Sequence, residues 1–193
     1  ATPATPSAPA ASEAATSAPA LPDKPSIAVL PFTNMSGDAE QEYFSDGITE
    51  DLITDISKVS GLFVIARNST FAYKGQSPEI RKVARELGVR YVLEGSVRKV
   101  GGRVRINAQL IEAETGGHIW ADRYDGDLED IFALQDEITA KIVAALEVNL
   151  TASEEKQAVR VLTSNVDAYD TFLRGRTLFN AFTPENTAGA RKY

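Results

Sequence analysis

Four carboxylates within residues 43–59 are the first side chains in this sequence that could do chemistry. Asp46, Glu50, Asp51 and Asp55 include pairs spaced four residues apart, a spacing that brings carboxylates together on one face of a helix. Such a group could coordinate a cation or act in acid and base catalysis. A solvated acidic helix face explains the same spacing without a ligand, and we favour that interpretation.

One histidine and no cysteine leave few other reactive groups. The lack of cysteine excludes disulfides, thiolate zinc sites, iron–sulfur clusters and a cysteine nucleophile. His118 would need a serine nucleophile beside it, and no GxSxG string is present. Strand alternation predicts that His118 and Trp120 share one face, where His118 is a structural or partly exposed residue. We therefore expect no catalytic residue, no metal and no cofactor.

The loop after the first predicted strand is the candidate ligand site. Pro31, Asn34, Gly37 and Asp38 lie beyond the carboxyl end of that strand, where α/β sheets often bind ligands. Neither GxGxxG nor GxxxxGK[ST] occurs there, and Asp38 and the acidic residues that follow it would repel a phosphate. A structural cap and loop is favoured over a ligand cradle.

The elements of the first half alternate between strands and helices. Short apolar runs predict strands, and apolar residues spaced three and four apart predict amphipathic helices. We expect Gly61 to stop the first helix, and Ser77 and Pro78 to cap and open the second, which Gly88 ends. Short connections in this order favour parallel neighbours. The predicted elements are strand 27–30, helix 43–59, strand 62–65 and helix 77–87.

The second half predicts an antiparallel meander. Strands 91–100 and 103–111 are joined by Gly101-Gly102, a pair suited to a tight hairpin, and strand 118–124 returns antiparallel. The fold class is therefore α/β with a mixed sheet. The hairpin register pairs Val100 with Arg103, Arg98 with Arg105, Ser96 with Asn107, and Glu94 with Gln109 on one polar surface. The opposite surface, expected against helices, carries Leu93, Val97, Val104, Ile106, Ala108 and Leu110.

This polar strand surface, with Arg98, Arg105 and Asn107, is a candidate docking face for a partner domain or an acidic peptide. An ordinary solvated face is favoured over that role. Arg98 and Arg105 should repel each other unless an acidic residue lies near. The acidic loop 125–130 lacks the ligand spacing of an EF-hand, so we expect it to cap the long helix that follows over 131–148.

The two ends of the chain differ from this body. Residues 1–25 are rich in proline, alanine, serine and threonine, which predicts a disordered linker with extended polyproline segments. Residues 151–165 are polar and predict a connector. A last helix over 167–182 places Tyr169, Phe172 and Leu173 on an apolar face that would bind a partner, since helix-pair repeats bury such faces only by stacking.

Composition limits the classes of function. The 193 residues carry 20 basic and 27 acidic side chains, and a net charge of −7 gives no positive field for a nucleic-acid backbone. No run of about 18 apolar residues occurs, so we expect no membrane insertion by this segment. The chain begins with Ala1 and stops in a predicted helix, from which we infer a fragment of a longer polypeptide.

Several long strings resemble the TolB-like amino-terminal domain of large bacterial signalling proteins. They are VLPFTNMSGD, EYFSDGITEDL, YVLEGSVRK and GGHIWADRYD, and the resemblance covers residues 26–150. It implies an output module upstream, a class III adenylate or guanylate cyclase or a CadC-type winged-helix regulator. The tail over 166–193 resembles the first helix pair of a tetratricopeptide array. The resemblance supplies no catalytic positions.

The sequence therefore predicts a non-catalytic regulatory or scaffolding domain. It would bind protein partners through the helical repeat and the polar sheet face, and it would be covalently attached to an output domain such as a cyclase. The alternative is a small-molecule sensor with its ligand near the loop after the first strand. The side of the membrane stays open, with an extracytoplasmic segment of an inner-membrane protein preferred over a cytoplasmic one.

Overall fold

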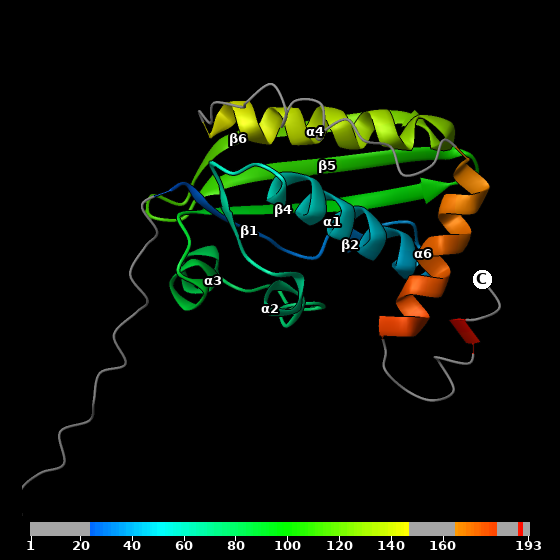
Figure 1. Cartoon of the computed structure of the whole chain (residues 1–193), viewed down its shortest axis with the longest axis horizontal. Helices are drawn as coiled ribbons and strands as arrows, with labels where there is room; N and C mark the ends of the chain where they lie inside the picture. Colours follow the sequence, from blue (N-terminus) through cyan, green and yellow to red (C-terminus); the bar gives the residue numbers. More distant parts are fainter. Residues whose placement is uncertain (1–23, 147–164, 181–188, 191–193) are drawn as a thin grey trace, which may run out of the picture.

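A six-stranded mixed sheet is the centre of the computed structural model, which describes residues 24–146, 165–180 and 189–190. The strand order is β3-β1-β4-β5-β6, and the short β2 pairs with β4 (Figure 1). The expected α/β class with a mixed sheet is confirmed. The strands are β1 (Ser26–Val29), β2 (Thr33–Asn34), β3 (Phe63–Val64), β4 (Tyr91–Val100), β5 (Arg103–Glu112) and β6 (Gly117–Asp127).

The helices include the three predicted ones in the body and one near the carboxyl end. The short α2 and two 3-10 turns, η1 and η2, were not predicted. The linker up to residue 23, the connector over 151–164 and most of the sequence after residue 180 lie outside the described residues. The helices are α1 (Glu42–Ser57), α2 (Arg67–Phe71), α3 (Ile80–Leu87), α4 (Ile131–Ala145) and α6 (Val166–Asn180), with η1 (Ala39–Gln41) and η2 (Leu128–Asp130).

Two helix boundaries differ from their prediction. α1 ends at Ser57, before Gly61, because the Lys58 amide bonds to the carbonyls of Asp55 and Ile56 and tightens the last turn. α3 begins at Ile80, and its N-cap residue Glu79 makes no side-chain cap bond, so the predicted cap at Ser77 is wrong. Gly88 ends α3 as expected, with a left-handed φ of 65°.

The parallel half of the sheet follows the predicted order. β1 pairs in parallel with β3 on one side and with β4 on the other. Its side chains alternate between two apolar layers, Ile27 and Val29 facing the main core and Ala28 and Leu30 facing a smaller cluster with α3. A continuous apolar run is what a strand covered on both faces requires.

The antiparallel half confirms the predicted register, because all four predicted cross-strand pairs occur between β4 and β5. Gly101 takes a positive φ of 58° in the connecting turn. β6 extends to Asp127, so the start of the expected acidic loop is strand, and Asp130 makes no side-chain cap bond to α4. The predicted apolar face is buried throughout: Leu93, Val97, Val104, Ile106, Ala108 and Leu110.

A β-bulge in β6 changes where its side chains point. Leu110 pairs with Trp120 and Ile111 pairs with His118, which leaves Ile119 as the extra residue. Paired residues point to the same side of a sheet, so Trp120 packs on the main core while His118 lies on the opposite face, exposed. The expectation that the two share a face is wrong.

The helices form layers on the sheet. α1 and α4 cover the face that holds the main core, and α6 stands across one end of α1 (Figure 1). α3 covers the other face near β1 through Val83 and Ala84. The polar surfaces of β4 and β5 lie on this second face and are partly exposed.

Candidate functional site

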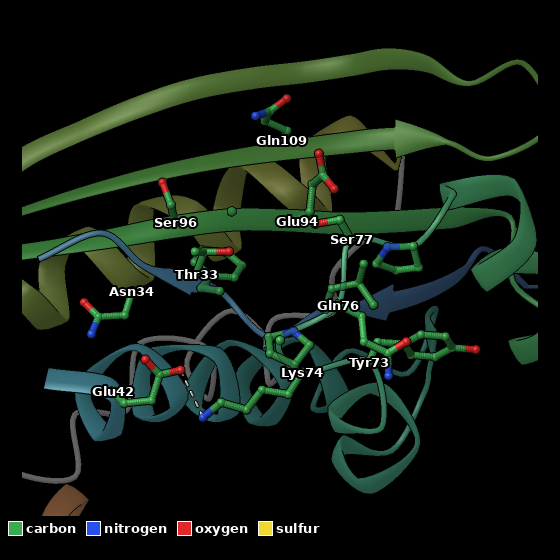
Figure 2. A pocket seen from close by; sticks show the side chains of 16 residues that line it. Thr33, Asn34, Glu42, Tyr73, Lys74, Gln76, Ser77, Glu94, Ser96 and Gln109 are labelled. Carbon is green, nitrogen blue, oxygen red and sulfur yellow. Dashed lines mark ion pairs between the residues drawn. The ribbon is translucent and has the colours of Figure 1, made fainter. Parts of the chain in front are cut away.

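A cleft of about 520 Å³ lies where the loop after β1 meets the polar face of β4 and β5 (Figure 2). Pockets for small ligands occupy about 300–1,000 Å³, so its size is suitable. The start of α1 and the segment between α2 and α3 complete the walls. The lining residues are Leu30, Pro31, Phe32, Thr33, Asn34, Glu42, Tyr73, Lys74, Gly75, Gln76, Ser77, Pro78, Glu94, Gly95, Ser96 and Gln109.

The floor of the cleft depends on the break between β1 and β2. Pro31 has no amide to donate, and the Phe32 amide donates to Thr49 Oγ1 on α1 at 3.0 Å instead of to the sheet. The Phe32 ring lies over Gly95, where a Cβ would be 2.6 Å from Phe32 Cε2 and 2.4 Å from the Asn107 carbonyl. Any larger residue at position 95 would displace the Phe32 ring, which is 1% exposed and packs in the main core.

The four predicted ligand residues separate into two groups. Pro31 and Asn34 line the cleft, whereas Gly37 and Asp38 do not. Asp38 Oδ1 accepts from the Glu40 amide at 2.9 Å and so caps η1, and Gly37 needs its φ of 79° to form the turn. Gly37 and Asp38 therefore shape the loop, and ligand binding at Pro31 and Asn34 stays a prediction.

The polar strand surface is internally bonded. Arg105 forms an ion pair with Asp125 of β6 at 2.5 Å, so an acidic residue does lie beside the two facing arginines. The hydrogen bond from Arg105 lowers the pKa of the Asp125 carboxyl. Asn107 Nδ2 donates to Ser96 Oγ at 3.0 Å, and Arg98 Nε donates to a carbonyl of the loop after β2 at 3.1 Å. Partner binding by this surface stays a prediction, and its neighbours Glu94, Ser96 and Gln109 belong to the cleft.

The carboxylates of α1 form neither a cation site nor a solvated face. Each of the four predicted carboxylates forms an ion pair with a basic side chain. The favoured solvated face and the alternative cation site are therefore both wrong. Burial raises the pKa of the Asp46 carboxyl, and the bond from Lys74 opposes that rise. The ion pairs are Lys74–Asp46 (2.5 Å), Arg67–Glu50 (2.9 Å), Arg176–Asp51 (3.1 Å) and Lys58–Asp55 (2.7 Å).

α6 is packed onto α1 through a glycine in the middle of that helix. Leu173 is fully buried and Tyr169 is 3% exposed, both within the main core. Leu173 fits above Gly47, where a Cβ would be 2.5 Å from Leu173 Cδ2. The expectation that further repeats must cover Tyr169 and Leu173 is wrong, because α1 covers Leu173 at Gly47 and the Tyr169 ring packs on Phe132 of α4. Phe172 is 50% exposed, and its role in partner binding stays a prediction.

Charged groups surround this contact, which we call the α1–α6 joint and define by Gly47, Tyr169, Asp170, Leu173 and Arg176. Asp170 accepts from Lys99 at 2.7 Å and from Arg174 at 2.9 Å, and the Tyr43 hydroxyl also bonds to it. Burial acts to raise the pKa of Asp170, but these hydrogen bonds outweigh it and lower the pKa to about 2. Arg176 donates to the Gly47 carbonyl at 3.2 Å, and the Tyr169 hydroxyl donates to Asp51.

The sequence signalled some of these features only weakly. A glycine inside an apolar helical pattern is a signal for close packing, and Gly47 could have been found that way. The segment 73–78, which forms a wall of the cleft, has no such signal. Within the described ranges 24–146, 165–180 and 189–190, no group of three or more His, Asp or Glu residues could hold a metal. The helices in those ranges include none with the length and hydrophobicity needed to cross a membrane.

Comparison with known proteins places the chain in a family. Residues 23–141 match the profile described as "HilA/YgeH-like transcriptional regulator, second domain". The chain is also 64% identical over 169 residues to a Rhizobium meliloti (strain 1021) protein named "Putative adenylate cyclase 3". That match covers 88% of this chain and 29% of the relative, so the chain spans less than a third of the relative's length.

Solved structures similar to the chain include two bacterial proteins. TolB from Acinetobacter baumannii has a TM-score of 0.49 and 17% identity, covering 66% of this chain and 29% of TolB. Lipoprotein GNA1162 from Neisseria meningitidis has a TM-score of 0.47 and 18% identity, covering 62% of this chain and 99% of that protein. TolB is thus among the structures that resemble the chain, while the tetratricopeptide assignment stays a prediction. By the match over residues 23–141, the chain belongs to the family of HilA/YgeH-like transcriptional regulator second domains.

Proposed function

We propose that this chain is a non-catalytic regulatory and protein-interaction domain of a larger bacterial signalling protein, attached to an adenylate cyclase. The relative that is 64% identical is named as a cyclase, and most of its length lies outside the match. The carboxylates of α1 support the non-catalytic part of the proposal. They are held in ion pairs, and general acid or base catalysis needs a group within reach of a substrate proton.

The α1–α6 joint is the observation that carries this proposal. α6 opens the proposed tetratricopeptide region, and it contributes Tyr169 and Leu173 to the core that also contains α1 and the sheet. A partner that moves α6 would therefore move Leu173 off Gly47 and disturb Arg176 and Asp51. Packed interfaces tend to have discrete arrangements, which makes the joint suitable for relaying occupancy of the repeat to an attached output domain.

The partner-binding surfaces belong to the same proposal. They are the polar face around Arg98, Arg105 and Asn107, and the exposed side of α6 at Phe172. We also propose an extracytoplasmic position in an inner-membrane parent, with a cytoplasmic one as the alternative. Protease accessibility of a tag in this domain, measured in spheroplasts and in lysed cells, distinguishes the two positions.

A capture experiment tests the interaction role. Residues 1–193 serve as bait beside two variants, Arg98→Glu on the polar face and Lys141→Glu as a charge-matched control. Lys141 is exposed on α4, on the opposite side of the sheet. We expect a discrete partner that the wild type and the control recover equally and that the polar-face variant loses. Equal recovery by all three baits contradicts the role of the polar face.

The same chain incubated with ATP and Mg²⁺ should form no cyclic nucleotide, because the proposed catalytic domain lies outside it. Turnover that disappears in His118→Ala, with folding retained, would contradict the non-catalytic assignment. His118 is the most informative position because it is the one imidazole of the sequence.

A small-molecule sensor is the second candidate function, and the cleft supports it. The cleft has a ligand-sized volume, apolar surface at Pro31 and Pro78, and polar side chains that include Glu94, Ser96 and Gln109. A ligand that binds only the folded state raises the unfolding temperature. A thermal-shift screen of metabolites and nucleotides therefore tests this function, and the absence of any shift across such a screen would reject it.

A further inference from the structure

Glu94 is a carboxylate in the cleft that has no basic partner. It lies at the middle of β4, half-buried, and among the described residues no lysine or arginine pairs with it. Gln109 is its direct cross-strand neighbour on β5, and both side chains line the cleft (Figure 2). A carboxylate beside an amide offers several acceptor oxygens in one place.

The one lysine of the cleft does not neutralise Glu94. Lys74 turns toward α1, away from Glu94, where it lies 3.2 Å from Glu42 and 2.5 Å from Asp46 (Figure 2). Its charge is therefore already matched by two carboxylates. The cleft as a whole carries an unmatched negative charge at Glu94, and an anionic ligand would be repelled.

The remaining walls suit the carbon chain of a small ligand. Tyr73 donates its hydroxyl to Glu86, so the ring and not the hydroxyl is presented to the cleft. Pro31 and Pro78 add apolar surface to the walls. Aromatic faces attract organic cations, and apolar surface favours their methylene groups.

We infer that the cleft binds a small organic cation with a protonated primary amine, held by Glu94 and Gln109. The ammonium group donates to the Glu94 carboxylate and to the Gln109 amide oxygen, and the methylene chain of the ligand lies along Tyr73 and the two prolines, Pro31 and Pro78. This inference rests on the second proposed function, because it names the ligand class of the proposed sensor.

Titration calorimetry of residues 1–193 with two four-carbon probes tests the inference. Putrescine carries two ammonium groups, and succinate carries two carboxylates on a chain of equal length. Putrescine should bind and succinate should not. Glu94→Gln keeps the shape of the side chain and removes its charge, so it should weaken putrescine binding by about tenfold or more. Glu137→Gln makes the same change on the exposed side of α4 and should leave binding unchanged.

A second variant guards against misfolding of the first. Gln109→Glu adds a carboxylate beside Glu94 and should tighten putrescine binding. Putrescine that binds all of these variants equally, or fails to bind the wild type, overturns the inference. If succinate, or another metabolite without a positive charge, raises the unfolding temperature while putrescine does not, the chain is still a sensor but the assignment of an amine ligand is wrong. If no metabolite has an effect, both fail.

Discussion

Replacing Gly47 by alanine should leave the free energy of unfolding unchanged or lower it while residue 173 is leucine. The same replacement should raise the free energy of unfolding once residue 173 is alanine. A Cβ at position 47 would lie 2.5 Å and 2.6 Å from the two Cδ atoms of Leu173 and 3.0 Å from its Cγ. Carbon atoms in favourable contact are about 3.5–4.0 Å apart. Leu173 or the whole of α6 must therefore move when Gly47→Ala is introduced.

The magnitude follows from two opposing effects. Alanine inside a helix is about 0.8–1.0 kcal/mol more favourable than glycine, which stabilises α1. Overpacking of a filled core costs about 1–3 kcal/mol, which destabilises the joint. Gly47→Ala alone should therefore leave the chain unchanged to about 2 kcal/mol less stable. In a Leu173→Ala background the colliding atoms are gone, and the same substitution should stabilise by about 1 kcal/mol.

Urea unfolding of four proteins measures this coupling: wild type, each single variant and the double variant. Leu173→Ala alone should cost about 2–5 kcal/mol because a fully buried leucine is truncated. The free energies of unfolding should then show a coupling of about 1–3 kcal/mol between positions 47 and 173. A coupling below about 0.5 kcal/mol, with Gly47→Ala stabilising in both backgrounds, would refute the packing of Leu173 above Gly47.

Three further predictions concern the turn, the joint and the bulge. Gly101→Ala should lower the free energy of unfolding by about 1 kcal/mol, because Gly101 has a φ of 58°. Gly102 has the same open space around it but no left-handed φ, so Gly102→Ala should change the free energy of unfolding by less than about 0.5 kcal/mol. Urea unfolding of both variants tests the turn. The pKa of Asp170 is about 2 in the folded chain, below its ordinary value of 3.8, so its contribution is complete above about pH 4 and is lost as the pH falls toward 2. Asp170→Asn should remove about 2 kcal/mol at pH 7 and flatten that part of the stability profile, and an unchanged profile would contradict the ion pairs. Trp120→Ala should lower the free energy of unfolding by about 2 kcal/mol, and His118→Ala should lower it by less than about 0.5 kcal/mol. Equal losses of stability in the two variants would argue against the bulge.

The sheet could be predicted from sequence because its signals are local. β1 shows as a short apolar run and the hairpin as two alternating strands around Gly101-Gly102, and together these determine the strand directions and the pairing of Arg98 with Arg105. The outline of α4 follows equally from its apolar spacing. In each case the periodicity of one or two adjacent segments carries the information.

The site could not be predicted to the same extent, because it joins segments that are distant in sequence. Asn34 was recognised as a candidate, but the opposite wall at Lys74 follows the one-turn helix α2, which is too short to produce a periodic pattern. The bulge at Ile119 adds one residue to β6 and so reverses the face of His118 without any change in composition. Three carboxylates of α1 are predicted to face solvent because their partners, Arg67, Lys74 and Arg176, come from elsewhere in the chain.

The most direct test of the proposed regulatory role is the rate of cyclic AMP formation by the cyclase parent that we propose for this chain. Gly47→Ala disturbs the α1–α6 joint, and Gly101→Ala is a comparably destabilised control in a turn of the sheet. Coupling between sites is commonly about 1–3 kcal/mol, so we expect Gly47→Ala to alter the rate by about fivefold or more and Gly101→Ala to leave it unchanged. Equal rates in the wild type and both variants would contradict a relay through the joint.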